Sequence, residues 1–238
     1  YFQPQYSILR NKIVGFEALS RIKGQYQNEM SIMEFIEIAE RTGHMISIGD
    51  YVFDKAFEFV KKVADKDIVV SLNVSPVQLL QTGFVSNFLE KVKKYDLKKG
   101  SVSLEITETF LMSSFDEMIE KLHILKENGI KIHLDDFGVA YSSMLYLKKL
   151  PINSIKIDKE FVADIINNKI SRVICGKIID ITNELNLDSI AEGVETKEQL
   201  QLLKELGCKV IQGFYISSAL PQQEAAELLN KGSIFNGV

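Results

Sequence analysis

Two adjacent carboxylates, Asp135 and Asp136, follow an apolar run in the segment IKIHLDDFGVAYSS, residues 130–143. Two acids side by side repel each other unless a cation lies between them, so a strand that ends in Asp-Asp indicates divalent-metal chemistry. A lone Asp pair more often caps the helix that follows it. The rest of the chain favours the metal, because strands that end in polar residues recur along it.

Six further predicted strands also end in a side chain that can bind a metal, move a proton or form hydrogen bonds. Strand side chains alternate between two faces, so each of these residues shares a face with the residue two positions before it. The residue between them is apolar in every case, and we expect it to face an outer layer of helices. The strand-end residues are Glu17, Asn73, Glu105, Asp135, Lys156, Glu192 and Gln212.

Four of these strand-end residues are carboxylates: Glu17, Glu105, Asp135 and Glu192. Gathering them in one mouth is strongly unfavourable without cations. Oxygen ligands joined by an asparagine, with no Cys or His cluster, favour Mg²⁺ or Mn²⁺ over zinc. We expect His133 to pack in a layer of small residues below this polar ring rather than to bind a metal.

The elements that position these residues alternate regularly. Only Arg10 to Lys12 separate the first two predicted strands, a connection too short for a parallel crossover, so this pair must be antiparallel. From residue 68 onward strands alternate with helices, which predicts parallel βαβ units. The expected strands span residues 1–9, 13–19, 68–73, 102–106, 130–135, 152–157, 189–192 and 209–213. The expected helices span residues 31–41, 51–63, 85–95, 115–128, 142–149, 171–186, 197–206 and 222–230.

We therefore predict a single domain over residues 1–238, a TIM-like (β/α)8 barrel with its first strand antiparallel. Its length of 238 residues suits such a barrel, whose C-terminal mouth is where active sites lie. An open doubly wound sheet is the alternative, although no Gly-rich phosphate fingerprint follows any strand. The chain opens inside a strand at Tyr1, so we expect it to be part of a longer protein.

Composition narrows the class of partner. A net charge of −4 provides no basic field for long DNA or RNA, but a small phosphate-bearing ligand fits if metals supply positive charge. Two isolated cysteines suit a reducing compartment, and no signal peptide or long apolar run argues for secretion or membrane contact. We expect a cytoplasmic domain.

At these residues the chain closely resembles the EAL-domain family of cyclic di-GMP phosphodiesterases. The resemblance runs from Gln3-Pro4 to Leu220-Pro221, nearly the whole chain. Neither composition nor periodicity names the substrate, so that expectation comes from the resemblance alone. The matching motifs are EALSR at 17–21, EFIEIAERTG at 34–43, SLNVS at 71–75, LEITE at 104–108, LDDFG at 134–138, YSSMLYLKKLPINSIKID at 141–158, AEGVET at 191–196, ELGC at 205–208 and QGF at 212–214.

The resemblance implies the same reversed barrel and a phosphodiesterase that uses two Mg²⁺ or Mn²⁺ ions to activate water and to cut cyclic di-GMP to linear 5′-pGpG. Lys156 would hold or help deprotonate the attacking water, and two nearby dications should lower its pKa. With Lys156, Glu192 and Glu17 would be catalytic. The implied metal ligands are Glu17, Asn73, Glu105, Asp135 as the bridge between the ions, Asp136, Glu192 and, through a water, Gln212.

The resemblance also assigns residues around the metals. Arg21 would contact a ligand phosphate, and Glu108 would brace the loop at residues 136–143. Glu195 would share in this bracing. The full set of implied substrate-binding residues is Gln3, Arg21, Asn73, Asp158 and Glu195.

Two departures from the family pattern bear on activity. Val139 and Ala140 replace the Thr-Gly of the usual DDFGTGYSS, in a loop that couples metal binding to the dimer interface in the family. Losing a glycine restricts the backbone, which leaves rate and dimerisation open. The segment 217–219, Ser-Ser-Ala in place of Ser-Arg-Pro, removes an arginine contact to the dinucleotide.

Two functions follow from these observations. The complete ligand set with Lys156 favours an active phosphodiesterase, and the altered loop keeps open a catalytically weak or inactive cyclic di-GMP receptor or regulatory domain. The resemblance implies a homodimer and, in the full-length protein, an N-terminal sensor or GGDEF domain that could supply membrane attachment.

Overall fold

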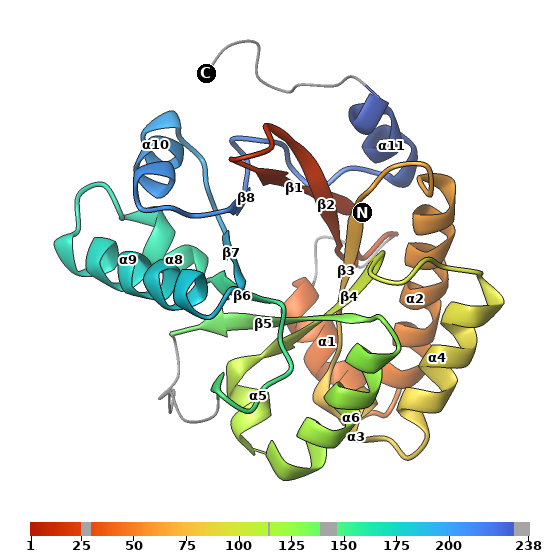
Figure 1. Ribbon diagram of the computed structural model, residues 1–238. Helices are drawn as coiled ribbons and strands as arrows, with labels where there is room; N and C mark the ends of the chain where they lie inside the picture. The colour runs from red at the N-terminus through yellow and green to blue at the C-terminus, as the bar shows by residue number, and fades with distance from the viewer. Residues whose placement is uncertain (25–29, 114, 139–146, 231–238) are drawn as a thin grey trace.

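The computed structural model describes residues 1–24, 30–113, 115–138 and 147–230. Eight strands pair in chain order and close into a barrel, with helices around it (Figure 1). The strands are β1 (Phe2–Ser7), β2 (Lys12–Ala18), β3 (Val69–Asn73), β4 (Val102–Thr107), β5 (Lys131–Phe137), β6 (Ser154–Ile157), β7 (Asp188–Ala191) and β8 (Val210–Gln212).

The strand β1 runs against both of its neighbours, β2 and β8, and every other neighbouring pair in the barrel is parallel. Pairing of Gln5 with Gln212 joins the first strand to the last and closes the sheet. The predicted barrel with a reversed first strand is confirmed, and the open doubly wound alternative is wrong.

The described helices lie near their predicted positions, with differences that follow from segment length. Capping boxes at Ser31 and Thr196 start α1 and α10 where the sequence places them. The predicted helix at 51–63 begins earlier, at Met45.

Three short helices, α3, α5 and α8, were not predicted, because five or six residues carry little periodic signal. The predicted helix at 142–149 lies mostly outside the described residues. The helices are α1 (Ile32–Arg41), α2 (Met45–Lys62), α3 (Pro76–Leu80), α4 (Phe84–Lys94), α5 (Glu108–Ser113), α6 (Phe115–Glu127), α8 (Lys159–Ala163), α9 (Lys169–Glu184), α10 (Lys197–Glu205) and α11 (Gln222–Asn230).

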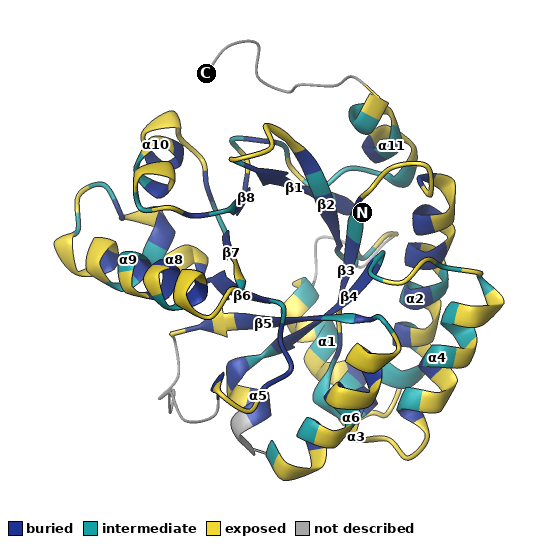
Figure 2. Ribbon diagram, viewed as in Figure 1, coloured by how far each residue is buried: buried dark blue, intermediate teal, exposed yellow. Residues whose placement is uncertain are grey.

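The apolar core fills the space between the strands and the helices (Figure 2). Phe16, Leu72 and Leu104, predicted to face outward from the strands, are fully buried in it. Phe53 of α2 packs edge-on against Phe88 of α4, with ring centroids 5.2 Å apart. Because this outer layer is apolar, the polar strand residues are left to face the inside of the barrel. Along the described ranges, none of the helices is both long and apolar enough to cross a membrane.

Neighbouring strands are staggered, as the tilt of strands in a closed barrel requires. Glu17 pairs with Ser71, Asn73 with Glu105, and Glu105 with His133. The prediction that His133 lies in a layer below the polar ring is therefore wrong. His133 lies beside Glu105 and not one layer below it.

Candidate active site

The ammonium group of Lys156 lies among four carboxylates at the C-terminal ends of the strands. Its Nζ is 2.6 Å from Glu105 Oε2, 2.7 Å from Glu192 Oε1, 3.2 Å from Asp135 Oδ2 and 3.6 Å from Glu17 Oε2. The lysine side chain is 1% exposed. Carboxylates at the ends of β2, β4, β5 and β7 thus converge on one buried positive charge that β6 supplies.

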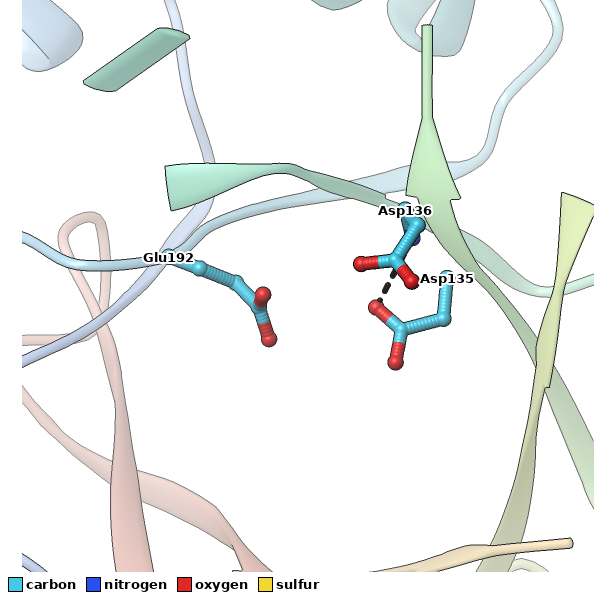
Figure 3. A group of neighbouring side chains, drawn as sticks. All are labelled: Asp135, Asp136 and Glu192. Atoms are coloured by element: carbon cyan, nitrogen blue, oxygen red, sulfur yellow. Dashed lines mark hydrogen bonds between the residues drawn. The ribbon is translucent and has the colours of Figure 1, made fainter. Parts of the chain in front are cut away.

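Asp135 and Asp136 both reach this cluster because β5 is irregular. The β5–β6 pairing shifts register between Leu134 and Phe137, and Asp136 adopts a left-handed φ of 53°. Adjacent side chains of a regular strand point to opposite faces. Here one carboxylate oxygen each from Asp135, Asp136 and Glu192 lies within 4.8 Å of the others, and the Asp136 N–H donates to Asp135 Oδ1 at 3.0 Å (Figure 3).

Side-chain amides hold both oxygens of Glu17. Asn73 Nδ2 donates to Oε1 at 2.7 Å, and Gln212 Nε2 donates to Oε2 at 2.5 Å. Gln5 Nε2 in turn donates to Gln212 Oε1 at 3.0 Å, and Gln212 Nε2 lies 3.3 Å from Gln3 Oε1. Sequence reasoning missed Gln5, although the alternation along β1 could have placed it on the inner face.

A polar layer supports Glu105 from beside it. Ser71 Oγ lies 3.4 Å from His133 Nδ1, which is 3.5 Å from Glu105 Oε1. Burial, helped by the charges of Lys156 and Lys131, lowers the pKa of His133 to about 3, so the ring is neutral. Among the described residues Glu105 Oε1 has no hydrogen-bond partner. His133 is confirmed as a packed inner residue.

Burial raises the pKa of Glu105 well above its ordinary value, and the charges of Glu17 and Asp135 raise it further. Burial likewise raises the pKa of Glu192 to about 7. Burial would also raise the pKa of Glu17, but the Lys156 ammonium and the amide hydrogen bonds lower it below its usual range. The negative charge of the mouth is therefore reduced in two ways, by protons on the carboxylates with raised pKa values and by the Lys156 ammonium.

Burial alone would lower the pKa of Lys156, but Glu105, Glu17, Glu192 and Asp135 together raise it well above its ordinary value. The sequence predicts a lowered pKa for Lys156 because the resemblance places two dications beside the amine. Here carboxylates surround the amine instead, and they raise its pKa. In this structure the lysine is a protonated hydrogen-bond donor.

The residues of the mouth suit divalent cations. Carboxylate oxygens with an asparagine amide are the hard ligands that Mg²⁺ and Mn²⁺ prefer. Glu105 Oε1, which has no hydrogen-bond partner in the described part of the chain, is a buried acceptor that a cation could satisfy. With all five carboxylates ionised and the lysine protonated, the group carries four negative charges, which two divalent cations would neutralise. These groups are Glu17, Glu105, Asp135, Asp136, Glu192 and Lys156.

Two other predicted residues contact the backbone beside the mouth. The Gly138 N–H donates to Glu108 Oε2 at 3.0 Å, and the predicted bracing of the loop by Glu108 stays a prediction. Asp158 is buried and accepts from the Glu160 N–H at 2.8 Å, so it caps α8. Val139 and Ala140, with the rest of that loop to residue 146, lie outside the described residues.

Arg21 and Glu195 are exposed. The Arg21 guanidinium donates to the Ser20 carbonyl at 2.8 Å and lies 5.7 Å from the centre of the Tyr1 ring. The Glu195 N–H donates to Gln199 Oε1. Within the described part of the chain, neither side chain joins the carboxylate cluster.

A closed barrel with a reversed first strand defines the class of TIM-like barrels, and its acidic, lysine-centred mouth lies where such barrels carry their active sites. Within that class, the chain belongs to the EAL domain family, whose family model matches residues 1–219.

Two curated relatives show how much of a longer protein this domain represents. The signaling protein YkoW of Bacillus subtilis is 37% identical over 231 residues, which cover 96% of this chain and 29% of that protein. MucR of Pseudomonas aeruginosa, described as a bifunctional diguanylate cyclase/cyclic di-GMP phosphodiesterase, is 32% identical over 227 residues, 94% of this chain and 33% of that protein. The chain spans about a third of the length of these relatives.

Solved structures match the fold closely. The MucR phosphodiesterase in complex with cyclic di-GMP has a TM-score of 0.89 at 31% identity, covering 94% of this chain and 92% of that one. Klebsiella pneumoniae BlrP1, in a complex with manganese and cyclic di-GMP, has a TM-score of 0.80 at 26% identity, covering 91% of this chain and 54% of that one.

Proposed function

We propose that this domain is a metal-dependent phosphodiesterase that hydrolyses cyclic di-GMP to linear 5′-pGpG. The observation that carries the proposal is the convergence of Glu17, Glu105, Asp135 and Glu192 on Lys156. Membership of the EAL domain family and the printed ligands and activities of MucR and BlrP1 support the choice of substrate.

Mg²⁺ or Mn²⁺, in two adjacent sites, is the proposed cofactor, and when bound it would offset phosphate charge and make water acidic. Its proposed ligands are those of the resemblance: Glu17, Asn73, Glu105, Asp135, Asp136, Glu192 and, through a water, Gln212. The four formal negative charges of the mouth support two ions over one.

The reaction adds one water across a P–O3′ bond. The water oxygen bonds to phosphorus, the bond to the 3′ oxygen breaks, and the 3′ oxygen leaves with a proton. Lys156 is the residue that we propose to hold the attacking water and to take or return its proton. Because carboxylates raise the pKa of Lys156 here, its work as a base depends on those carboxylates being shared with cations.

The surrounding residues hold the substrate and the metal ligands. We propose that Arg21, Gln3, Asn73, Asp158 and Glu195 contact the dinucleotide. Arg21 is exposed, so a phosphate at the edge of the mouth can reach its guanidinium. Glu108, through its hydrogen bond from the Gly138 N–H, would keep the start of the following loop in place.

The test is chromatographic detection of pGpG from cyclic di-GMP with Mg²⁺, Mn²⁺ or EDTA. Metal-dependent product from the native sequence, lost in Glu17→Ala, is expected. Glu198→Ala, an exposed glutamate in the first turn of α10, is the matched control and should keep full activity. Near-normal turnover by Glu17→Ala would contradict the proposed metal site. Tight binding of cyclic di-GMP without product would make the domain a receptor.

We further propose that residues 1–238 form one barrel domain of a longer protein that carries a sensor or GGDEF domain and that pairs as a homodimer. The name of MucR, which includes a diguanylate cyclase activity, supports a second domain. The free and buried Cys175 and Cys208 support a cytoplasmic, reducing location. Sedimentation with and without cyclic di-GMP tests the dimer, and cell fractionation tests the location.

A further inference from the structure

The Lys156 ammonium is itself a cation that lies among carboxylates of the proposed metal site. Its Nζ is within hydrogen-bonding distance of Glu105 Oε2 and Glu192 Oε1, at 2.6 and 2.7 Å, and lies 3.2 Å from Asp135 Oδ2. The ammonium donates a hydrogen bond to Glu105 Oε2 and forms ion pairs with Glu192 and Asp135, which come from other parts of the barrel. The Lys156 side chain is almost fully buried, so bulk water does not screen the charges of the carboxylates around it.

We propose that Lys156 is a built-in counter-ion that holds the acidic mouth together before metals bind and that competes with the incoming metals for Glu105, Asp135 and Glu192. This inference rests on the metal site proposed above and goes beyond the handling of water by the lysine. The carboxylate oxygens that contact Nζ are drawn from the same residues that would bind the ions.

The competition has two consequences of opposite sign. Without metals, four carboxylates close to one buried point repel each other, and the ammonium is the positive charge that offsets this repulsion. With metals, the same ammonium is a like charge beside the ions and weakens their binding. A residue that served only the attacking water would have neither effect.

The experiment compares Lys156→Met, which keeps side-chain length and removes the charge, with the native sequence at pH 8. In EDTA we expect the variant to melt roughly 5–15 °C lower, the cost of breaking a buried ion pair in a domain of this size. Mn²⁺ should remove most of that difference. Calorimetric titration should show Mn²⁺ binding at least about tenfold tighter than to the native protein.

Lys209→Met is the matched control, because Lys209 pairs with Asp188 at 3.3 Å on the protein surface. The control substitution should change the melting temperature in EDTA by no more than about 2 °C, and it should leave the Mn²⁺ affinity unchanged. Equal stability in EDTA, or Mn²⁺ affinity equal to or weaker than native, for Lys156→Met overturns the inference.

A second variant covers the case in which Lys156→Met does not fold. Glu192→Gln combined with Lys156→Met removes one charge of each sign from a pair 2.7 Å apart. We expect the double variant to fold in EDTA and to be more stable than the single one. Failure of the double variant to fold overturns the inference. If the native protein does not bind Mn²⁺, the proposed function is overturned together with this inference. If the native protein binds Mn²⁺ and Lys156→Met has the same melting temperature in EDTA and the same Mn²⁺ affinity, this inference alone is overturned.

Discussion

At Lys156 burial and charge act in opposite directions. Burial favours a neutral amine, but the surrounding carboxylates favour the ammonium and raise its pKa. Burial and charge also oppose each other in setting the pKa of each acid, and the surroundings of the acids differ. Glu17 has two amide donors, whereas Glu105 Oε1 has no partner among the described residues. The Lys156 charge and the amide hydrogen bonds thus favour the ionised form of Glu17, whereas burial and the charge of Glu17 favour a proton on Glu105.

Gln5→Ala should weaken Mn²⁺ binding and kcat/KM by roughly 10–100-fold, the usual effect of removing a residue that orients a metal ligand. Gln5 is buried and orients Gln212, which donates to Glu17. Calorimetry and the pGpG assay measure the two quantities. Gln201→Ala, which removes an exposed glutamine paired with Glu205, is the control and should leave both unchanged. Equal results for the two variants would show that Gln5 does not position the site.

Mn²⁺ binding should release protons and weaken as the pH falls through about 7. The pKa of Glu192 is raised to about 7, so below that pH its carboxyl carries a proton that a cation must displace. Titration calorimetry in buffers of different ionisation enthalpy measures the released protons at pH 6.5 and pH 8. More release is expected at pH 6.5, and Glu192→Gln should lose that difference. An equal release at both values would contradict the raised pKa.

Among the elements, the ends of the strands carry most of the constraint. Gly213 follows β8, and a Cβ there would lie 2.2 Å from the Val194 carbonyl oxygen. The Val194 N–H donates to the Gln212 carbonyl at 3.1 Å, so this close approach ties the segment after β7 to the end of β8. Glu192 and Gln212 lie on the two segments that this contact joins.

Gly213→Ala should therefore destabilise the fold by about 1–3 kcal/mol, the usual range for overpacking, and reduce activity. Gly176→Ala is the matched control: it lies inside α9, and its Cβ would meet Leu206 Cδ2 at an ordinary 3.6 Å. That substitution should stabilise the domain by about 0.5–1 kcal/mol. Urea unfolding measures both. A tolerated Gly213→Ala would show that Val194 can move without cost.

For the whole molecule, closure of the barrel brings together groups that local sequence keeps far apart. Gln5 and Gln212 come from opposite ends of the chain and pair across β1 and β8. The carboxylates at the ends of four strands then face the lysine of a fifth, which stores electrostatic repulsion in the fold. Ligands that relieve this repulsion should stabilise the entire domain, because a cation that binds only the folded state shifts the folding equilibrium.

Mn²⁺ or Mg²⁺ at about 100 times its Kd should raise the stability by about 2.7 kcal/mol per site, or roughly 5–11 °C in melting temperature. Differential scanning fluorimetry against an EDTA reference measures the shift. Asp135→Asn should abolish most of it, and equal ionic strength from NaCl should not reproduce it. A shift that Asp135→Asn leaves intact would place the stabilising ions elsewhere.

Much of the fold could be predicted from the sequence because its signals are local. Alternation along each strand predicted which residues face the helices, and the connection from Arg10 to Lys12 predicted the antiparallel first pair. The motifs around Glu17 and Asp135 were specific enough to indicate the family that the comparison then showed.

Only the tertiary structure decided how the site is assembled. The register shift in β5 that turns Asp136 toward Asp135, the stagger that sets His133 beside Glu105, and the role of Gln5 all arise from pairing between strands. The contacts of Lys156 with four carboxylates likewise depend on barrel closure. A sequence carries the periodicity of each strand, but tilt and register are set jointly by all eight strands, so the distances between the site's charges exist only in the closed barrel.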